Sequence, residues 1–534
     1  MPIFMDFSDS WSSSFILHLA VESNMTNASA NTATLVRKSL GNSMSACPLY
    51  FVTPNSIPVI SNRSTSGILI LDAIHEQTTP TNNRTAIAVM IVSASVIDLP
   101  LFLCYSQKFL KKLLFFRGFM DVKRICAEVL DGIRPDKKRV ADVLYVVKPF
   151  LKSISDNLKS LKLSAKVVLG GSFAKGTWLS GDFDVDVFVK FAMKYKDDDL
   201  SGLLEQVLKP FGPERVHGSR DYFWVRKGGI KFEIVPVLAI SRPEQAQNVT
   251  DFSPLHVAWV NENGAGLKDD IRLLKQFCKA NGVYGAESFI RGFSGHVVDI
   301  LVIHFNGFLN LLKAASSWKT NKKIVIDHYN KYKGRALFFL NKSKTQSPLV
   351  VVDPVQPDRN AAAALSLEKL RVFLKAVRGF LKRPSEEFFV LHKPDFNKLS
   401  KKGHLFVVDV KTLDAKPDVA GAKFVRAFEF VKKQLGDFGV VDSGWEWDEK
   451  SKGLWWFVLK QDELPVFFEL KGPPVNLKDS VVAFKKKHKS VFVRNGRLFA
   501  KVKRDLTSAF DVLLQALGSD FVVGRVRSAK VGLV

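Results

Sequence analysis

Two aspartates separated by one residue are the part of the chain whose spacing most directly suits chemistry. Asp184 and Asp186 alternate with the apolar residues Val185 and Val187, which is the period-two pattern of a β-strand. The pattern puts both carboxylates on one face and the apolar side chains on the buried face. Because neighbouring carboxylates repel each other unless a divalent cation holds them, the pair predicts a Mg²⁺ site.

The residues just before this pair predict a phosphate-binding turn. An apolar run over residues 167–169 leads into Gly170, Gly171 and Ser172, and Lys175 follows. Glycine lets the backbone come close to a phosphate, while the amides, the hydroxyl and the ammonium are suitable donors for a triphosphate. Such a turn is a weak signal alone. Followed by two carboxylates at this spacing, it favours a nucleotide site over an ordinary solvent-facing strand.

A third carboxylate would complete the site. Glu233 alternates with Phe232 and Ile234 within the apolar run 230–236, so a strand is expected there. We expect a neighbouring strand to present Glu233 to the same ions, which would give a two-metal site for in-line attack on a nucleoside triphosphate. A single Glu in a strand is usually structural, so this prediction depends on the aspartate pair.

The charge of the chain indicates a polyanionic partner. Its 534 residues include 78 Lys and Arg and 52 Asp and Glu, a formal net charge of +26. The first 119 residues hold eight basic and six acidic residues, which leaves 70 basic and 46 acidic residues, a net of +24, in the rest. Phosphates are attracted to such a surface at long range, although many basic proteins bind nothing specific.

The first 119 residues differ from the rest in composition. They are rich in Ser, Thr and Asn, so we expect an N-terminal extension that is disordered or not native. Its apolar stretch over residues 86–105 is interrupted by Asp98 and Pro100, which disfavours a membrane-spanning helix. Folded protein is expected to begin near Met120 with an amphipathic helix, whose apolar face carries Val122, Ile125, Val129 and Ile133.

The cysteines and the N-terminus favour a reducing, cytoplasmic location. Cys47, Cys104, Cys126 and Cys278 lie far apart without a C-x-x-C pair, which argues against a zinc ribbon and a disulfide framework. No basic segment precedes the first apolar residues, so a secretory signal is not expected.

The metal and phosphate motifs together resemble the DNA polymerase beta-like nucleotidyltransferase superfamily. Within it, the chain is similar to the archaeal-type (class I) CCA-adding enzymes, which are tRNA nucleotidyltransferases. The resemblance covers roughly residues 120–505. The blocks that carry it, in the order of the family, are residues 251–256, 272–277, 281–287, 292–295, and 352–355 leading to Arg359 and Asn360, with weaker matches at 472–474 and 495–497.

This resemblance implies an α/β and α+β multidomain architecture. A mixed α/β palm is expected over residues 120–256, after the extension at 1–119. A helical neck would follow at 257–385, and a basic α+β body and tail that holds the tRNA acceptor arm at 386–534.

The resemblance also implies roles for single residues. Asp184, Asp186 and Glu233 would be the catalytic Mg²⁺ ligands, with Glu233 nearest the attacking 3′-hydroxyl. Positions that hold the triphosphate match Ser172, Lys175, His256, Lys275 and Tyr284, all of which are phosphate donors. Arg359 would read the incoming base, because a guanidinium offers the forked donors that a base edge needs.

One of these assignments departs from the family, and two have plainer alternatives. The family usually has Asp where this chain has Glu233, a side chain longer by one methylene, although either carboxylate can bind Mg²⁺. Lys275 lies on a predicted amphipathic helix and could be an ordinary solvated lysine. His256 could be a core histidine with its hydrogen bonds satisfied.

The implied function is CCA addition to the tRNA 3′ end from CTP and ATP without a nucleic-acid template, releasing pyrophosphate. A poly(A) polymerase-like terminal nucleotidyltransferase with the same palm is the nearest alternative. A catalytically silent RNA-binding or membrane-tethered protein is disfavoured by the three intact carboxylates, and a small-molecule nucleotidyltransferase by the net charge of +24. The sequence leaves the oligomeric state, a homodimer included, open.

Overall fold

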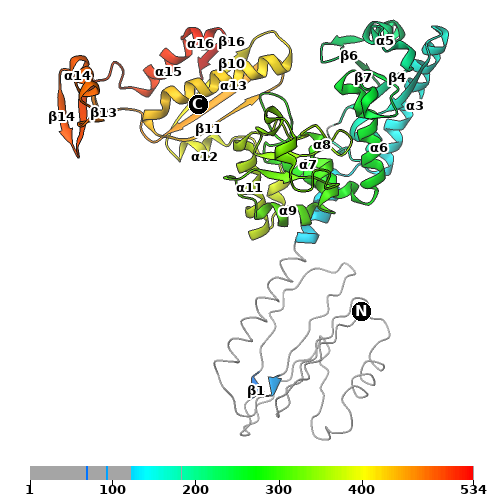
Figure 1. The fold of residues 1–534 in the computed structure, drawn as a ribbon, viewed down its shortest axis with the longest axis horizontal. Helices are drawn as coiled ribbons and strands as arrows, with labels where there is room; N and C mark the ends of the chain where they lie inside the picture. The colour runs from blue at the N-terminus through cyan, green and yellow to red at the C-terminus, as the bar shows by residue number, and fades with distance from the viewer. Residues whose placement is uncertain (1–67, 70–91, 94–121, 182, 533–534) are drawn as a thin grey trace. The chain divides into compact units, whose positions relative to one another are not determined.

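The computed structural model describes residues 68–69, 92–93, 122–181 and 183–532 (Figure 1). The chain divides into two compact units, Met1–Arg117 and Gly118–Val534. In the first unit the structure describes one short antiparallel pair, β1 (Ile68–Leu69) and β2 (Val92–Ser93). The expectations for an extension over residues 1–119 and for the apolar stretch 86–105 otherwise concern positions outside the described residues.

A five-stranded sheet carries both carboxylate strands. Its order is β3-β4-β7-β6-β5, and all neighbours are antiparallel except the central pair β4 and β7, which is parallel. The strands are β3 (Ala165–Leu169), β4 (Val185–Phe191), β5 (Glu214–Val216), β6 (Tyr222–Lys227) and β7 (Ile230–Leu238). The two predicted strands therefore lie side by side in the middle of the sheet.

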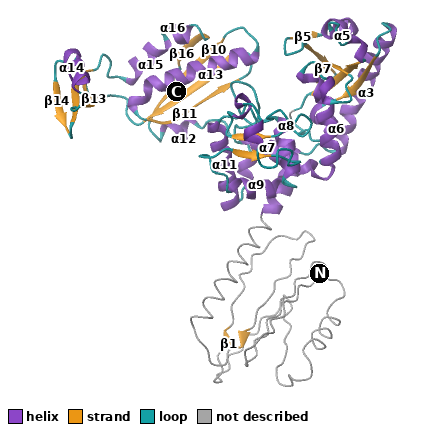
Figure 2. Ribbon diagram, viewed as in Figure 1, coloured by secondary structure: helices purple, strands orange, loops and turns teal. Residues whose placement is uncertain are grey.

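One face of this sheet is covered by helices α3 (Lys137–Ser160) and α5 (Leu200–Leu208) (Figure 2). The apolar residues of β4 that alternate with the aspartates are fully buried against them, as the period-two pattern predicts. The ring of Phe150 on α3 packs 4.5 Å from that of Phe232 on β7. This packing fixes which face of β4 and β7 is left for the carboxylates.

A helical core follows the sheet. Its helices are α6 (Ser253–Asn263), α7 (Lys268–Ala280), α8 (Gly295–His304), α9 (Phe308–Ser316) and α11 (Leu367–Lys382). Phe277 lies at its centre, with the rings of Phe308 and Phe380 about 6 Å away. Residues 122–133 are helical, as expected, but Val122, Ile125 and Val129 are buried in this core rather than under the sheet.

No single described helix has the length and apolar composition needed to cross a membrane. The helices α8 and α9 meet these criteria only when they are taken together, with a bend of 89° between them.

A smaller segment of two strands and one short helix lies between α9 and α11 in the chain. It contains the parallel strands β8 (Ile324–Ile326) and β9 (Leu349–Val351) and the short helix α10 (Ala336–Phe339). A small apolar cluster of Ala336, Leu340 and Val350 holds it together.

The C-terminal part contains two antiparallel sheets. The first has the order β11-β12-β10-β16 and packs against α13 (Pro417–Gln434) and α15 (Ala509–Leu517) around the buried Trp455. Its strands are β10 (His404–Thr412), β11 (Val440–Trp447), β12 (Lys452–Leu459) and β16 (Val526–Val531), with the short helices α12 (Phe396–Ser400) and α16 (Asp520–Val523) beside them. The second has the order β13-β15-β14 and consists of β13 (Phe467–Pro474), β14 (Val491–Arg494), β15 (Arg497–Lys503) and the helix α14 (Lys478–Lys487).

Candidate nucleotide and metal site

The Gly-Gly-Ser turn packs directly against the aspartate strand. β3 ends at Leu169, and the short helix α4 (Gly171–Lys175) begins one residue after Gly170, whose N–H donates to the Asp186 carbonyl at 2.8 Å. Gly171 has a φ of +53°, and a Cβ there would lie 1.5 Å from Asp186 Oδ2. Glycine is therefore required at this position both by the backbone conformation and by the carboxylate beside it.

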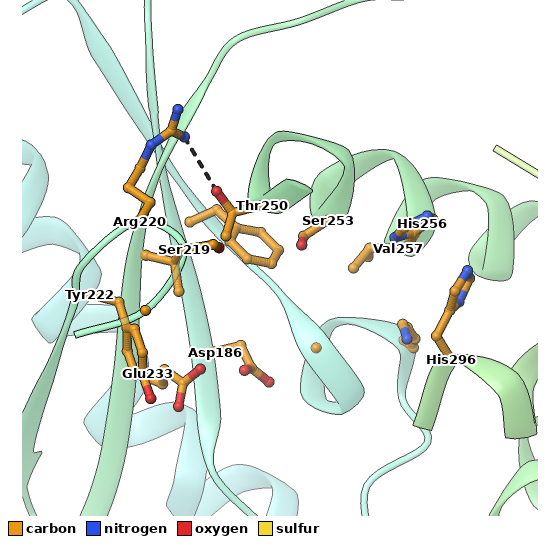
Figure 3. Close-up of a pocket in the computed structure, with 15 residues that line it drawn as sticks. Asp186, Ser219, Arg220, Tyr222, Glu233, Thr250, Ser253, His256, Val257 and His296 are labelled. Atoms are coloured by element: carbon orange, nitrogen blue, oxygen red, sulfur yellow. Dashed lines mark hydrogen bonds between the residues drawn. The ribbon is translucent and has the colours of Figure 1, made fainter. Parts of the chain in front are cut away.

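The parallel pairing of β4 and β7 brings two predicted carboxylates together. Asp186 is directly opposite Glu233 in the register, and Figure 3 shows their side chains next to each other at one end of a cavity. The indole N–H of Trp224 donates to Glu233 Oε2 at 3.2 Å, which orients that carboxylate. Asp184 is held differently, because its Oδ2 lies 2.7 Å from the ammonium of Lys231.

The electrostatics of this cluster are unfavourable to negative charge. Burial, and then the neighbouring Glu233, raise the pKa of Asp186 to about 7. Burial also raises the pKa of Glu233, although the hydrogen bond from Trp224 acts in the opposite direction. The two carboxylates thus compete for a proton, which a divalent cation could replace.

A cavity of about 360 Å³ joins the carboxylates to a set of cationic and imidazole side chains. Of the residues predicted from the sequence, Lys175, Asp186, Glu233 and His256 line it. Arg220 and His296, which the sequence did not single out, line it as well. Figure 3 shows His256 and His296 across the cavity from Asp186 and Glu233, so a carboxylate pair suited to a cation faces imidazoles that can bind phosphate oxygens.

Two lysines are buried behind and beside the turn. The ammonium of Lys175 lies 2.6 Å from Asp299 Oδ2, an ion pair that connects α4 to α8. Lys275, on α7, donates to the carbonyl and the hydroxyl of Thr177 at 3.2 and 3.1 Å. Burial lowers the pKa of Lys275 to about 8. Lys275 is therefore a buried support of the turn and not a solvated surface lysine.

The remaining predicted residues lie around the cavity without lining it. Ser172 is on α4, next to Gly171. The Tyr284 hydroxyl lies 3.0 Å from where a Cβ on Gly295 would be, so this glycine lets the phenol lie against the start of α8. Arg359 is linked to the cavity lining through Asp353. Its Nη1 lies 2.9 Å from Asp353 Oδ2, the oxygen that the lining residues His256 and His296 also approach.

Asp353 is fully buried and is the centre of a second polar group. His256 Nε2 and His296 Nε2 lie 3.1 and 3.5 Å from its Oδ2, and the two imidazole rings are 4.0 Å apart. Burial alone would raise the pKa of Asp353, but its contacts with the two histidines outweigh it and hold this pKa well below the usual range. Burial lowers the pKa of His296 to about 4, so its imidazole is neutral near pH 7.

The imidazoles retain unused hydrogen-bonding capacity. Although both Nε2 atoms lie near Asp353, His256 Nε2 and the two ring nitrogens of His296 make no hydrogen bond within the part of the chain that the structure describes. Among the described residues, His256, His296 and Asp353 also form the one group of three potential ligands whose binding atoms all lie within 4.8 Å of one another.

The sequence contained only weak signals for this second group. Asp353 lies inside the block 352–355, and His296 directly follows the block 292–295, but neither residue stands out by spacing. They meet His256 because α6, α8 and the segment after β9 pack together, and sequence periodicity does not report such contacts.

Comparisons with known proteins extend over most of the chain. Three family models match consecutive regions: a nucleotidyltransferase domain over residues 151–251, the second domain of tRNA nucleotidyltransferase over 269–390, and the C-terminal domain of the CCA-adding enzyme over 403–527.

Two similar proteins are both named CCA-adding enzyme. The CCA-adding enzyme of Nanoarchaeum equitans is 36% identical over 353 residues, which cover 65% of this chain and 86% of the relative. The CCA-adding enzyme of Methanosarcina mazei is 31% identical over 419 residues, covering 74% and 89%. A structure of the Cid1 poly(U) polymerase is 14% identical and covers 50% of this chain and 98% of its own, with a TM-score of 0.39, too low to support a functional argument.

Proposed function

The chain belongs to the CCA-adding enzyme family of tRNA nucleotidyltransferases, and from this membership we propose how its own residues add CCA to the tRNA 3′ end. The observation that carries the proposal is the pairing of Asp186 with Glu233 in a cavity that also contains Lys175 and His256. A poly(A) polymerase-like activity would use the same palm, but no observation on this chain favours it.

Asp184, Asp186 and Glu233 would hold Mg²⁺. When bound, this ion supplies positive charge to the triphosphate and to the attacking 3′ oxygen. The residues fit a divalent cation, because burial and then the charge of Glu233 raise the pKa of Asp186, and the positive charge of a cation would offset both effects. Asp184 can join only if it leaves the Lys231 ammonium, so we propose that this ion pair opens when the cation binds.

The triphosphate would occupy the same cavity. Lys175 and His256 line it, and His296 adds an imidazole whose ring nitrogens make no hydrogen bond to the described residues. Ser172 and the amides of α4 would complete the binding site, as backbone N–H groups often do for phosphates. Lys275 would support this turn from behind, with Tyr284 at the start of α8.

Base selection is assigned to Arg359. Its guanidinium is anchored by the buried Asp353, whose other oxygen accepts the backbone N–H groups of Val355 and Gln356 at 3.0 and 3.2 Å. A guanidinium fixed in this way keeps its remaining donors in a constant direction, which selection between CTP and ATP requires. The 3′-hydroxyl of the tRNA would attack the α-phosphorus, and pyrophosphate would leave.

The function is tested by product analysis at single-nucleotide resolution. The protein is incubated with a tRNA lacking CCA, Mg²⁺, and CTP and ATP singly and together. Two additions from CTP and one further addition from ATP are expected, whereas long A tails would establish the poly(A) alternative. Asp186→Asn should abolish all addition, while Asp142→Asn, on the exposed side of α3, should leave the products unchanged.

A further inference from the structure

Residues 327–345, here called the aromatic–basic segment, present large aromatic rings to solvent. Phe338 is 83% exposed, Tyr329 57% and Phe339 55%. Three exposed aromatic side chains within one short segment are unusual on a protein surface, and such patches mark interaction sites more often than single exposed apolar residues do. The chemistry proposed for the cavity does not use them.

The exposed rings are held in place. Phe339 stacks on Tyr332 with centroids 5.9 Å apart and planes inclined by 20°, and Phe338 meets Phe339 edge-on at 5.3 Å. The guanidinium of Arg335 lies 5.4 Å from the Phe339 centroid. A planar ligand that binds here therefore meets rings whose orientation is already fixed, which lowers the entropic cost of binding.

The segment is also basic. It carries Lys331, Lys333, Arg335, Lys342 and Lys344 against a single acidic residue, Asp327, whose carboxylate caps the backbone N–H groups of two following residues. Lys344 pairs with Asp358, but within the described part of the chain Lys331, Lys333 and Arg335 have no carboxylate within 4 Å. Aromatic rings among unpaired cations are the combination that binds single-stranded nucleic acid.

The segment packs on the loop that carries Arg359. The Tyr332 hydroxyl donates to the Pro357 carbonyl at 2.9 Å, and the Lys344 ammonium donates to the Asp358 carbonyl at 2.7 Å. On the other side, the indole N–H of Trp259 on α6 donates to the Tyr329 hydroxyl at 2.8 Å. The aromatic–basic segment is thus connected both to the base-selecting arginine and to the helix that carries His256.

We propose that the aromatic–basic segment binds the unpaired 3′ end of the tRNA acceptor arm. Bases stack on Phe338 and Phe339, and Lys331, Lys333 and Arg335 contact the phosphates. This inference rests on the proposed function, because it assumes that the 3′ end approaches the cavity. A second copy of the chain fits less well, since a symmetric contact through this segment would bring like charges together.

The test measures binding of an acceptor-stem hairpin with an unpaired ACC end, and of the same hairpin cut to a blunt end, without nucleotide or Mg²⁺. Phe338→Ala should weaken binding of the overhang hairpin about tenfold and leave the blunt hairpin unchanged, and Phe338→Trp should restore it. Tyr145→Ala, at an equally exposed aromatic residue of α3, is the matched control and should change neither.

Two outcomes would overturn the proposal. An equal loss with both hairpins would mean that the segment binds paired RNA, and an unchanged affinity combined with loss of a dimer in light scattering would assign it to a protein contact. Incorporation of CTP separates the two claims. Phe338→Ala should raise the KM for the overhang hairpin about tenfold, whereas absence of incorporation by the unsubstituted protein would contradict the proposed function and not this surface.

Discussion

At the scale of single residues, the central feature is a pair of carboxylates that are costly to ionise together. Asp186 and Glu233 face each other across a parallel strand pair, and burial is the largest cause of the raised pKa of each. The same buried charge that destabilises the cation-free site strengthens its attraction for a divalent cation. Metal binding and proton release should therefore be coupled.

This coupling predicts a specific pH dependence of stability. The pKa of Asp186 is about 3.8 when unfolded and about 7 when folded, so the folded state binds more protons between these values. The Mg²⁺-free protein should lose stability as pH rises from about 4 to 7, and Mg²⁺ should restore it. Thermal unfolding from pH 5 to 8 measures this effect, and Asp186→Asn should flatten the dependence. An unchanged slope in that variant would exclude Asp186 as its origin.

The ion pair between Lys231 and Asp184 gives a second prediction at this scale. Lys231→Gln frees the carboxylate and removes a nearby positive charge, so the Mg²⁺ concentration for half-maximal incorporation should fall about two- to fivefold. Arg226→Gln, directly across the strand pair from Lys231, removes the same charge without the ion pair and serves as control. A higher Mg²⁺ requirement in Lys231→Gln would contradict the proposed opening of the pair.

At the scale of elements, the sequence predicts the strands well and the contacts between distant segments poorly. The period-two alternation around Asp186 is a local property, so both the strand and its carboxylate face follow from it. The group of His256, His296 and Asp353 comes from three separate elements, and only tertiary packing brings these residues together. The ion pair between Lys231 and Asp184 could not be predicted from the sequence either, because it depends on the register between β4 and β7.

The α4 turn allows a test at this scale. Gly171→Ala places a Cβ on the Asp186 carboxylate and strains a left-handed backbone, so the carboxylate must move. A displacement of about 1 Å at a reacting group can lower the rate by about 100-fold, and a fall in kcat of that order is expected. Gly132→Ala, where the added Cβ meets nothing within 4 Å, is the control. Near-normal kcat in folded Gly171→Ala, verified by circular dichroism, would argue against this packing.

At the scale of the whole molecule, the net positive charge and the matches to the family models fall in the same part of the chain. The net charge of +24 lies after residue 119, in the same part of the chain that the three family models match. The helix over residues 122–133 was predicted from its periodicity. Its packing in the helical core could not be, because an amphipathic pattern does not specify its partner.

The net positive charge predicts that the KM for tRNA depends strongly on salt concentration and that the KM for CTP does not. Raising the salt concentration from 50 to 200 mM should increase the KM for tRNA at least about tenfold, because several phosphate contacts release counterions. The KM for CTP should change much less, since the contacts proposed for it are few and lie inside the cavity. Equal effects on both would mean that the basic surface does not bind the tRNA.

The most direct test of the central claim is a Mg²⁺ titration of CTP incorporation with Glu233→Gln and Glu233→Asp. The account predicts that Glu233→Gln loses at least about 100-fold in rate at any Mg²⁺ concentration. It predicts that Glu233→Asp keeps activity, because it retains a carboxylate opposite Asp186. If Glu233→Gln incorporated CTP at the normal rate and Mg²⁺ midpoint, Glu233 would not be a ligand, and the proposed metal site would be wrong.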